Sequence, residues 1–446
     1  MLVRALLPLC VLLSLAVGAQ EPTYLVMVSV DGLMPSAYTG DSVSRSPTLK
    51  ALTEQGAYAE GVIGVLPSVT YASHTTLITG VPPRVHGISG NTVVDPEGKS
   101  NYAWYWYSQS IRVPTLIDAA KQRGLTTAAI FWPVSVGMKA DFLVPEFWRS
   151  GSTHRSDASL IRALSTPGLF EGLEASVKHP AGWPLTDRDL TDLAVYILTT
   201  HKPRVLLLHL GSLDGAEHSA GPGSPRALET LQRIDGYLGE VRSAIAQAGL
   251  KDRTDFVIVS DHGFVPIERQ LQPNAVFKKE GLLTANEAGA ITEWRAYFHA
   301  EGGSGFVYLK NPDDRALIDR VRGLLDALKA DPKNGIASIW SREDLARFGA
   351  DPNATFGVGM LPGFYSGAAH DAVSVPTRSR GGHGFDPNLP ELHASFIIAG
   401  PHAGPGVNLG TVRMTQIAPT LAGLLGVSLS PQADQPIALT RGLRGR

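Results

Sequence analysis

The chain has only one cysteine in 446 residues, Cys10, and it lies in the leader segment at the amino terminus. Once this leader is removed, the mature chain contains no thiol, which excludes disulfide bonds, thiol catalysis and cysteine-ligated zinc. An excess of charge of one sign is also missing, because 39 Lys and Arg residues face 41 Asp and Glu residues, for a formal net charge of −2. This balance excludes a protein that coats nucleic acid or carries a long acidic tail.

A hydrophobic run long enough to span a membrane is missing as well. The apolar run at residues 5–17 follows Arg4 and is shorter than the about 20 residues that a spanning helix needs. Val17-Gly18-Ala19 supplies small residues where a signal peptidase reads. We therefore expect residues 1–19 to be a signal peptide cleaved near Ala19, with an uncleaved anchor as the alternative. Export without disulfides fits a bacterial periplasm or the medium.

Hydrophobic residues make up 43% of the chain, together with 47 glycines and 31 prolines. This composition fits a large globular protein with many loops and excludes a disordered chain, a collagen and a coiled coil. Short apolar runs alternate with helical patterns, as in a parallel sheet whose strands are joined by helices. We predict an α/β fold with a mostly parallel central sheet flanked by helices. The strands are expected at residues 24–30, 126–131, 204–210, 255–260 and 395–399.

One stretch, residues 265–380, breaks this alternation. It holds a possible hairpin, a helical pattern near residues 313–330 and a run rich in glycine and proline from Asp351. We interpret it as a small cap inserted into a core made of residues 20–264 and 381–430. Residues 431–446 are expected to form a solvated tail, which contains Arg441, Arg444 and Arg446.

Acidic residues and histidines follow three of the expected strands. Asp31 follows the first strand, Asp214 and His218 follow the strand ending at residue 210, and Asp261 and His262 follow the strand ending at residue 260. The carboxyl ends of parallel strands form the edge where open sheets bind ligands. Three carboxylates at one edge would repel one another, and a divalent cation removes that cost while it holds neutral imidazoles. The pattern therefore predicts a metal site.

The donor atoms in this set are oxygen and nitrogen only, which fits zinc or manganese better than calcium. Asp214 and His218 are four residues apart, so one helical turn directs both side chains at the same ion. Each residue taken alone has another interpretation, because Asp-Gly is a common turn pair and Asp214 could cap a helix. Their combination at matching strand ends favours the metal site.

Thr70 is a candidate nucleophile, at the start of a helical pattern that stops at Gly80. The free N–H groups and the dipole at the amino end of a helix favour a phosphoryl oxygen. A threonine there is also a common N-cap. Its hydroxyl has a high pKa and no histidine-carboxylate relay is evident nearby, so activation by a metal ion would link Thr70 to the carboxylate cluster. His74, one turn on, is expected to support the site or to pack.

Two motifs rich in glycine add further polar residues. Glycines on both sides of His383 permit close approach of the backbone to an ion, although such loops also occur without any ligand role. Asn91 ends the motif at residues 86–91, and its side chain can donate an N–H to an oxyanion. The alternative for Asn91 is a plain turn residue.

In this order, these residues resemble the nucleotide pyrophosphatase/phosphodiesterase family of the alkaline phosphatase superfamily. The resemblance extends from Tyr24 to about Leu425 and depends on five separated motifs. It implies an alkaline phosphatase-like core and two zinc ions per subunit. By resemblance, one zinc is held by Asp31, Asp261 and His262 and also carries Thr70, the other is held by Asp214, His218 and His383, and Asn91 with the Thr70 backbone N–H binds a non-bridging oxygen.

The implied reaction is attack of the Thr70 oxygen on phosphorus, followed by release of phosphothreonine by water activated on the second zinc. One residue departs from the family, which usually has Gly-His where this chain has Glu217-His218. Glu217 either points outward or tunes the second zinc.

The expected substrate is a small nucleotide diester or pyrophosphate. Related monoesterases neutralise the additional phosphate charge with Arg, Lys or a third metal, and Lys139 and Arg149 match no such motif. Tyr71 and Trp132 are candidates for a slot that stacks a nucleobase, with core packing as the alternative. A phosphate monoesterase or phosphonate hydrolase on the same scaffold stays open, as does a non-catalytic binding protein. The sequence fixes neither the leaving group, the native metal nor the oligomeric state.

Overall fold

The computed structural model describes residues 23–40, 45–100, 104–148, 154–177, 182 and 184–440. The expected signal peptide at residues 1–19, Arg149 and the basic end of the tail lie outside the described residues. Within these ranges, every helix is too short or too polar to cross a lipid bilayer.

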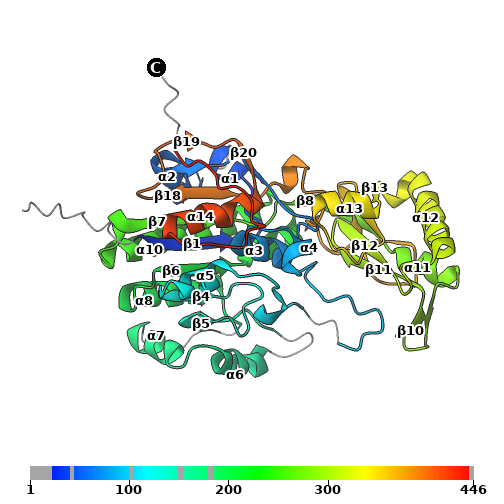
Figure 1. Cartoon of the computed structure of the whole chain (residues 1–446), viewed down its shortest axis with the longest axis horizontal. Helices are drawn as coiled ribbons and strands as arrows, with labels where there is room; N and C mark the ends of the chain where they lie inside the picture. The colour runs from blue at the N-terminus through cyan, green and yellow to red at the C-terminus, as the bar shows by residue number, and fades with distance from the viewer. Residues whose placement is uncertain are drawn as a thin grey trace, which may run out of the picture.

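An eight-stranded sheet forms the centre of the larger part of the molecule, in the order β19-β2-β18-β7-β1-β6-β4-β5 (Figure 1). Neighbours from β7 to β5 are parallel, whereas β18 runs antiparallel to β7 and β2. The prediction of a mostly parallel sheet is confirmed, and each expected strand lies within one residue of an observed one. The strands are β1 (Tyr24–Val30), β2 (Ala57–Tyr58), β4 (Thr127–Ile130), β5 (Phe142–Val144), β6 (Val205–Leu210), β7 (Thr254–Val259), β18 (Phe396–Ala399) and β19 (Val407–Asn408).

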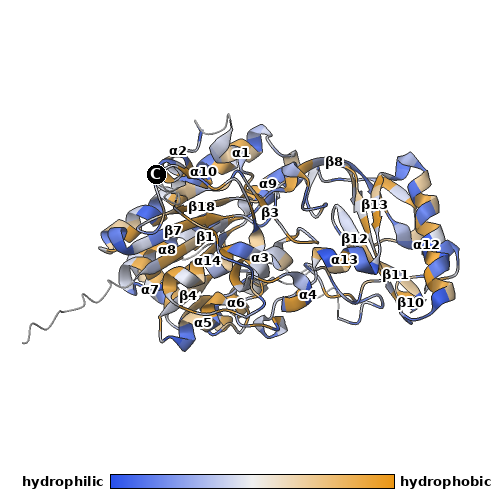
Figure 2. Ribbon diagram, turned by 45° about the horizontal axis from the view of Figure 1, so that its top comes forward, coloured by the Kyte–Doolittle hydropathy of each residue, from blue (hydrophilic) through white to orange (hydrophobic). Residues whose placement is uncertain are grey.

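Helices cover both faces of this sheet. Successive side chains of a strand point to opposite faces, so Val26 and Val28 pack on one side and Leu25 and Met27 on the other. The first face is covered by α2 (Pro47–Gln55), α8 (Asp187–Thr200), α9 (Ser212–Ala220) and α10 (Pro225–Gln247), and the second by α3 (Thr70–Thr79), α5 (Leu116–Gln122) and α14 (Ile417–Leu425). Figure 2 shows the apolar strands between these helices. Burial on both faces explains why the strands read as continuous apolar runs.

Shorter elements connect these layers. A small parallel pair of strands, β3 and β20, lies outside the main sheet. The elements are α1 (Ser36–Thr39), β3 (Gly61–Ile63), α4 (Pro83–His86), α6 (His154–Leu164), α7 (Leu169–Val177) and β20 (Thr411–Arg413).

Residues from Val265 to Gly382 form sheets of their own at the other end of the molecule (Figure 1). The expected hairpin is β11 (Ala296–Glu301) with β12 (Ser304–Leu309), and it belongs to an antiparallel sheet in the order β11-β12-β14-β13. The expected helix is α12 (Arg315–Ala330). The division into a core and a cap with the boundaries given above stays a prediction. The other elements are β8 (Val265–Leu271), α11 (Pro273–Lys279), β9 (Leu283–Ala285), β10 (Ile291–Trp294), β13 (Ile336–Trp340), α13 (Arg342–Phe348), β14 (Phe356–Met360), β15 (Gly363–Ser366), β16 (Ser374–Pro376) and β17 (Gly381–Gly382).

Candidate functional site

The six expected metal ligands meet at the carboxyl edge of the central sheet. They form two groups of three in which the potential ligand atoms lie within 4.8 Å of one another. Three strands and one helix place them, because they follow β1, β7 and β17 or lie on α9. The first group is Asp31, Asp261 and His262, and the second group is Asp214, His218 and His383.

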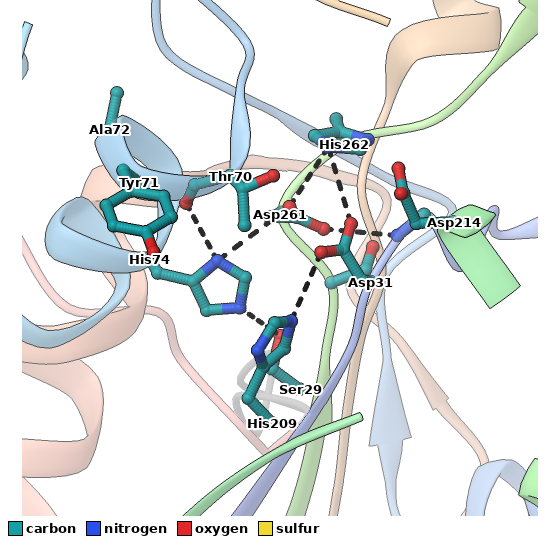
Figure 3. A network of polar contacts seen from close by, with 12 residues as sticks. Ser29, Asp31, Thr70, Tyr71, Ala72, His74, His209, Asp214, Asp261 and His262 are labelled. Carbon is teal, nitrogen blue, oxygen red and sulfur yellow. Dashed lines mark hydrogen bonds and ion pairs between the residues drawn. The ribbon is translucent and has the colours of Figure 1, made fainter. Parts of the chain in front are cut away.

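The first group is buried and rich in atoms that have no hydrogen-bond partner. The Nε2 atom of His262 lies 3.0 Å from Oδ2 of Asp261 and 3.5 Å from Oδ1 of Asp31 (Figure 3). Those two oxygens and both ring nitrogens of His262 have no hydrogen-bond partner within the described part of the chain. Each buried polar atom left in this way costs about 1–3 kcal/mol. A cation between them would satisfy the two oxygens and Nε2 of His262, so the donor set fits a metal ion.

The second group holds its histidines in the form that a metal ligand needs. Nε2 of His218 and Nε2 of His383 lie 3.3 and 3.7 Å from the same Oδ1 of Asp214. On the other side of each ring, Nδ1 lies 2.9 Å from the Gly381 carbonyl oxygen and 3.2 Å from the Ser68 carbonyl oxygen, respectively. Because a carbonyl oxygen only accepts, Nδ1 carries a proton in both rings, which leaves Nε2 as the ring nitrogen available to bind a metal ion.

The two groups are adjacent and share an electrostatic problem. The rings of His262 and His383 stack with centroids 3.6 Å apart. Burial, followed by the charges of Asp261 and Asp214, raises the pKa of Asp31 well above its usual value. Burial alone would raise the pKa of Asp261 too, but the neighbouring histidines, first of all His262, hold that pKa well below its usual value. The protein therefore cannot ionise all its carboxylates freely without a positive charge between them.

Thr70 is the first residue of α3, and its backbone lies beside these ligands. The N-cap position is taken by Val69, so the alternative of Thr70 as an N-cap is wrong. In Figure 3 the Thr70 hydroxyl lies on the side of Asp261 and His262. Asn91 meets the same helix end, because its Oδ1 accepts a hydrogen bond of 2.9 Å from the Tyr71 backbone N–H. This bond identifies Oδ1 as the acceptor of the side-chain amide, so Nδ2 is the atom left to donate.

Comparison with known proteins shows which family this site belongs to. A family model described as type I phosphodiesterase / nucleotide pyrophosphatase matches residues 25–356. The chain belongs to this family. Human ectonucleotide pyrophosphatase/phosphodiesterase family member 7 is 23% identical over 428 residues, which cover 93% of this chain and 83% of that protein. Venom phosphodiesterase 2 of Crotalus adamanteus is 25% identical over 259 residues, which cover 55% of this chain and 27% of that protein.

The solved structures agree with the family on the fold. Human ectonucleotide pyrophosphatase/phosphodiesterase 5 superposes with a TM-score of 0.63 at 18% identity, covering 92% of this chain and 96% of that chain. The α/β fold and a hydrolase activity of the phosphodiesterase type are therefore established for this chain. The family depends on metal ions, and the two groups of three ligands are the candidates to hold them.

His74 lies beneath Thr70, the candidate nucleophile, in the view of Figure 3. Its Nδ1 lies 2.8 Å from the Thr70 carbonyl oxygen and its Nε2 lies 2.8 Å from the Ser29 hydroxyl (Figure 3). The carbonyl only accepts, so Nδ1 donates and Nε2 accepts from Ser29. Burial, followed by the charge of His209, lowers the pKa of His74 to about 3. A neutral ring thus ties the first turn of α3 to strand β1.

Sequence reasoning missed two buried residues beside the first ligand group, His209 and Glu146. Nε2 of His209 lies 3.1 Å from Oδ2 of Asp31, and Nδ1 lies 3.7 Å from Oε1 of Glu146. Burial raises the pKa of Glu146 to about 8, and its Oε2 has no hydrogen-bond partner among the described residues. The one signal in the sequence was a histidine inside an apolar strand, and in the sheet His209 pairs with Ser29 of β1.

The structure corrects the expected aromatic slot. Trp132 is 0% exposed and packs edge-on against His74, with centroids 5.0 Å apart, so it is a core residue. Tyr71 is also 0% exposed, because the rings of Trp104, Trp106 and Trp148 surround it. Neither Trp132 nor Tyr71 presents a free face on which a base could stack.

Glu217 is buried beside the second group and is only 2% exposed, so the alternative in which it points outward is wrong. Burial, followed by the charges of Asp214 and Asp261, raises the pKa of Glu217 well above its usual value.

A cavity of about 930 Å³ lies elsewhere, between α13 and the segment at residues 432–435, and contains none of the expected site residues. The candidate site is therefore indicated by the buried polar atoms without hydrogen-bond partners at the two ligand groups, and the size of a cavity does not indicate it.

Proposed function

We propose that this protein is an exported phosphodiesterase that hydrolyses phosphodiester or pyrophosphate bonds of nucleotides through a phosphothreonine at Thr70. The observation that carries the proposal is the pair of three-residue ligand groups at one sheet edge, beside the amino end of α3. A helix amino end favours a phosphoryl oxygen, and the ligand groups favour cations, so both halves of the required chemistry are adjacent.

Two zinc ions are the proposed cofactors. Asp31, Asp261 and His262 would hold one ion, and Asp214, His218 and His383 would hold the other. When bound, the ions supply positive charge that favours the ionised Thr70 hydroxyl and stabilises the leaving oxygen. Oxygen and nitrogen donors without thiolate suit zinc, and the buried partnerless oxygens described above support the assignment.

The remaining steps use groups of this chain. The Thr70 oxygen attacks phosphorus, forms a P–O bond and expels an alcohol or a nucleoside phosphate. Nδ2 of Asn91 and the backbone N–H of Thr70 donate to a non-bridging oxygen, whose negative charge grows as the bond forms. Water then cleaves the new P–O bond and restores the Thr70 hydroxyl. A solved murine relative supports this role, because its threonine-to-alanine variant is described as inactive and in complex with AMP.

A diester is the proposed substrate, and a monoester is the alternative. A monoester carries one more negative charge, which must be met by another cation. Among the described residues, the ion pairs of Asp31, Asp214 and Asp261 join them only to histidines, and no Lys or Arg takes part. The partly exposed rings of Trp104 and Trp148 lie beside Tyr71 and would contact the nucleoside.

Turnover of a bis-aryl phosphate and of an aryl monophosphate by purified protein tests the proposal. We expect the diester to be hydrolysed faster, Thr70→Ala to lose more than about 10³-fold in kcat, and metal analysis to find two zinc ions per chain. Thr200→Ala, an exposed position on α8, is the matched control and should keep full activity. Monoester preference would replace the diesterase assignment, and unchanged hydrolysis by Thr70→Ala would revive a non-catalytic site. Amino-terminal sequencing of the exported protein should begin at Gln20.

A further inference from the structure

We propose that Glu301 is a positioning residue for the phosphoryl-transfer reaction and acts through Asn91. Glu301 ends strand β11 of the hairpin at residues 296–309, which we call the cap hairpin. This inference rests on the proposed function and extends it, because it assigns part of the oxyanion-binding geometry to the region that sequence analysis interpreted as a cap.

Glu301 contacts the loop that carries Asn91. Its Oε2 accepts a hydrogen bond of 3.2 Å from the Asn91 backbone N–H. The Glu301 side chain is buried, with 4% of its residue surface exposed. A Cβ added to Gly90 would lie 1.9 Å from Oε1 of Glu301. Only glycine at position 90 permits this approach, so the loop and the carboxylate are fitted to each other.

A histidine of the same hairpin fixes the other carboxylate oxygen. Nε2 of His299 lies 2.9 Å from Oε1 of Glu301, and Oγ1 of Thr92 lies 3.3 Å from the same nitrogen. Because a carboxylate only accepts, Nε2 donates to Glu301. Each oxygen of the carboxylate therefore has its own donor, and hydrogen bonds to a charged acceptor are stronger than neutral ones. The carboxylate cannot rotate without losing one of them.

The turn of the cap hairpin also lies against the loop of His383. The backbone N–H of Gly303 donates to the His383 carbonyl oxygen over 2.8 Å. Gly302 has φ +78°, and a Cβ there would lie 2.5 Å from that carbonyl oxygen. One hairpin therefore contacts the backbone at Asn91 and at His383, which are 292 positions apart in the sequence.

These contacts hold Asn91 at two points. Glu301 holds its backbone N–H, and the Tyr71 backbone N–H holds its side-chain oxygen. Together, these two bonds determine the direction in which Nδ2 of Asn91 points. A displacement near 1 Å at a catalytic group can cost about 100-fold in rate. Loss of the Glu301 contact should therefore lower kcat, whereas a purely structural role would change stability alone.

Glu301→Ala and Glu301→Gln test this role in the full-length, metal-loaded protein. We expect Glu301→Ala to lower kcat about 10- to 100-fold with a smaller change in KM. Glu301→Gln should retain most of the activity, because its amide oxygen still accepts from Asn91, and its NH₂ donates to Nε2 of His299 once the ring carries its proton on Nδ1 instead. Glu293→Ala, an exposed position on β10, is the matched control and should behave like the wild type.

A double-mutant cycle with Asn91→Ala separates positioning from independent effects. In the Asn91→Ala background, Glu301→Ala should lower kcat by less than about 3-fold, because the group through which it acts is gone. Equal losses in both backgrounds would overturn the inference, as would a loss of kcat that disappears when the variant is saturated with zinc. Hydrogen exchange gives a readout apart from activity. The backbone N–H of Asn91 should exchange at least about 10-fold faster in Glu301→Ala than in the wild type, and its rate should not change in Glu293→Ala.

The outcomes also distinguish the inference from the proposed function. A wild type that hydrolyses no diester defeats the proposed function. An active wild type whose Glu301→Ala variant keeps its kcat and its Asn91 protection defeats only the inference. Should the alanine variant fail to fold, Glu301→Asp takes its place, because the shorter side chain keeps the charge and withdraws the acceptor from Asn91. Unchanged kcat in Glu301→Asp then counts against the inference.

Discussion

His86 should make the protein less stable as the pH falls, and its hydrogen bonds show why. The ring is fully buried at the end of α4. Nδ1 accepts a hydrogen bond of 3.1 Å from the Ile88 backbone N–H, so the proton is on Nε2, which lies 3.0 Å from Oγ1 of Thr76. Protonation of Nδ1 would place its N–H against the backbone N–H of Ile88, and the hydrogen bond between them would be lost. Burial lowers the pKa of His86 to about 3, and the backbone at Ala72 opposes this only in part.

The magnitude follows from the difference between the folded and unfolded pKa. An unfolded histidine titrates near pH 6.5, so between that pH and about 3 the unfolded chain binds one more proton at this position than the folded chain. The folded-state pKa is lowered, so the stabilisation is complete above pH 6.5 and is lost as the pH falls. The slope approaches about 1.4 kcal/mol per pH unit, or about 2 kcal/mol between pH 6.5 and 4.5.

Urea unfolding at several pH values between 7 and 4.5 measures this slope. Other buried groups add slopes of their own, so the decisive quantity is the difference between the wild type and His86→Gln. We expect the variant to be less stable than the wild type at pH 7. As the pH falls, its free energy of unfolding should decrease less steeply than that of the wild type, by about 1.4 kcal/mol per pH unit. His201→Gln, at an exposed ring, is the control and should keep the wild-type slope. Parallel curves for the wild type and His86→Gln would refute the reasoning.

Three further predictions test the fold and the site. Gly56→Ala should destabilise by about 1–3 kcal/mol, because its Cβ would lie 2.0 Å from the Ile398 carbonyl oxygen; an unchanged urea midpoint would contradict this. Asp235→Asn should cost about 1–3 kcal/mol in urea unfolding, because both carboxylate oxygens accept 2.9 Å bonds from the backbone of Thr48 and Leu49 and an amide offers one acceptor. A chelator should abolish diesterase activity and lower the thermal unfolding midpoint, and zinc should restore both; activity that survives chelation would argue against the metal site.

The central sheet could be predicted from the sequence because its strands are buried on both faces. Residues 205–210 and 254–259 are buried without exception, so apolar runs marked them despite the lack of alternation. The position of Asp31 and Asp261 directly after such runs was enough to place them at one edge. His383 and Asn91 could be assigned to the site only through the resemblance to the family, since neither residue directly follows a predicted strand of the sheet.

The supporting residues could not be predicted, because their roles depend on contacts between distant segments. His209 lies in an apolar strand, and its partner Glu146 is 63 positions away, in a segment without a motif. Glu301 ends an ordinary hairpin strand, and only the folded chain brings it to Asn91. The sequence suggests Tyr71 for a stacking slot because it follows Thr70, and Trp132 because aromatic residues stack nucleobases in the family that the chain resembles. Both side chains are buried in the core, because closeness to a motif in the sequence does not determine the direction in which a side chain points.

The contacts of the second ligand group link metal binding to the region beyond Val265. His218 donates to the carbonyl oxygen of Gly381, which is in β17 and pairs with β8, and the His383 carbonyl oxygen accepts from Gly303 of the cap hairpin. The described side-chain hydrogen bonds of the first group instead join Asp261 to the Gly32 backbone N–H, just after β1, and Asp31 to His209 of β6. A cation at Asp214 would therefore order two histidines that contact β17 and the cap hairpin, in addition to the contact of His383 with Ser68. Because linkage is reciprocal, a cap hairpin loosened at Glu301 should weaken metal binding at the second group more than at the first.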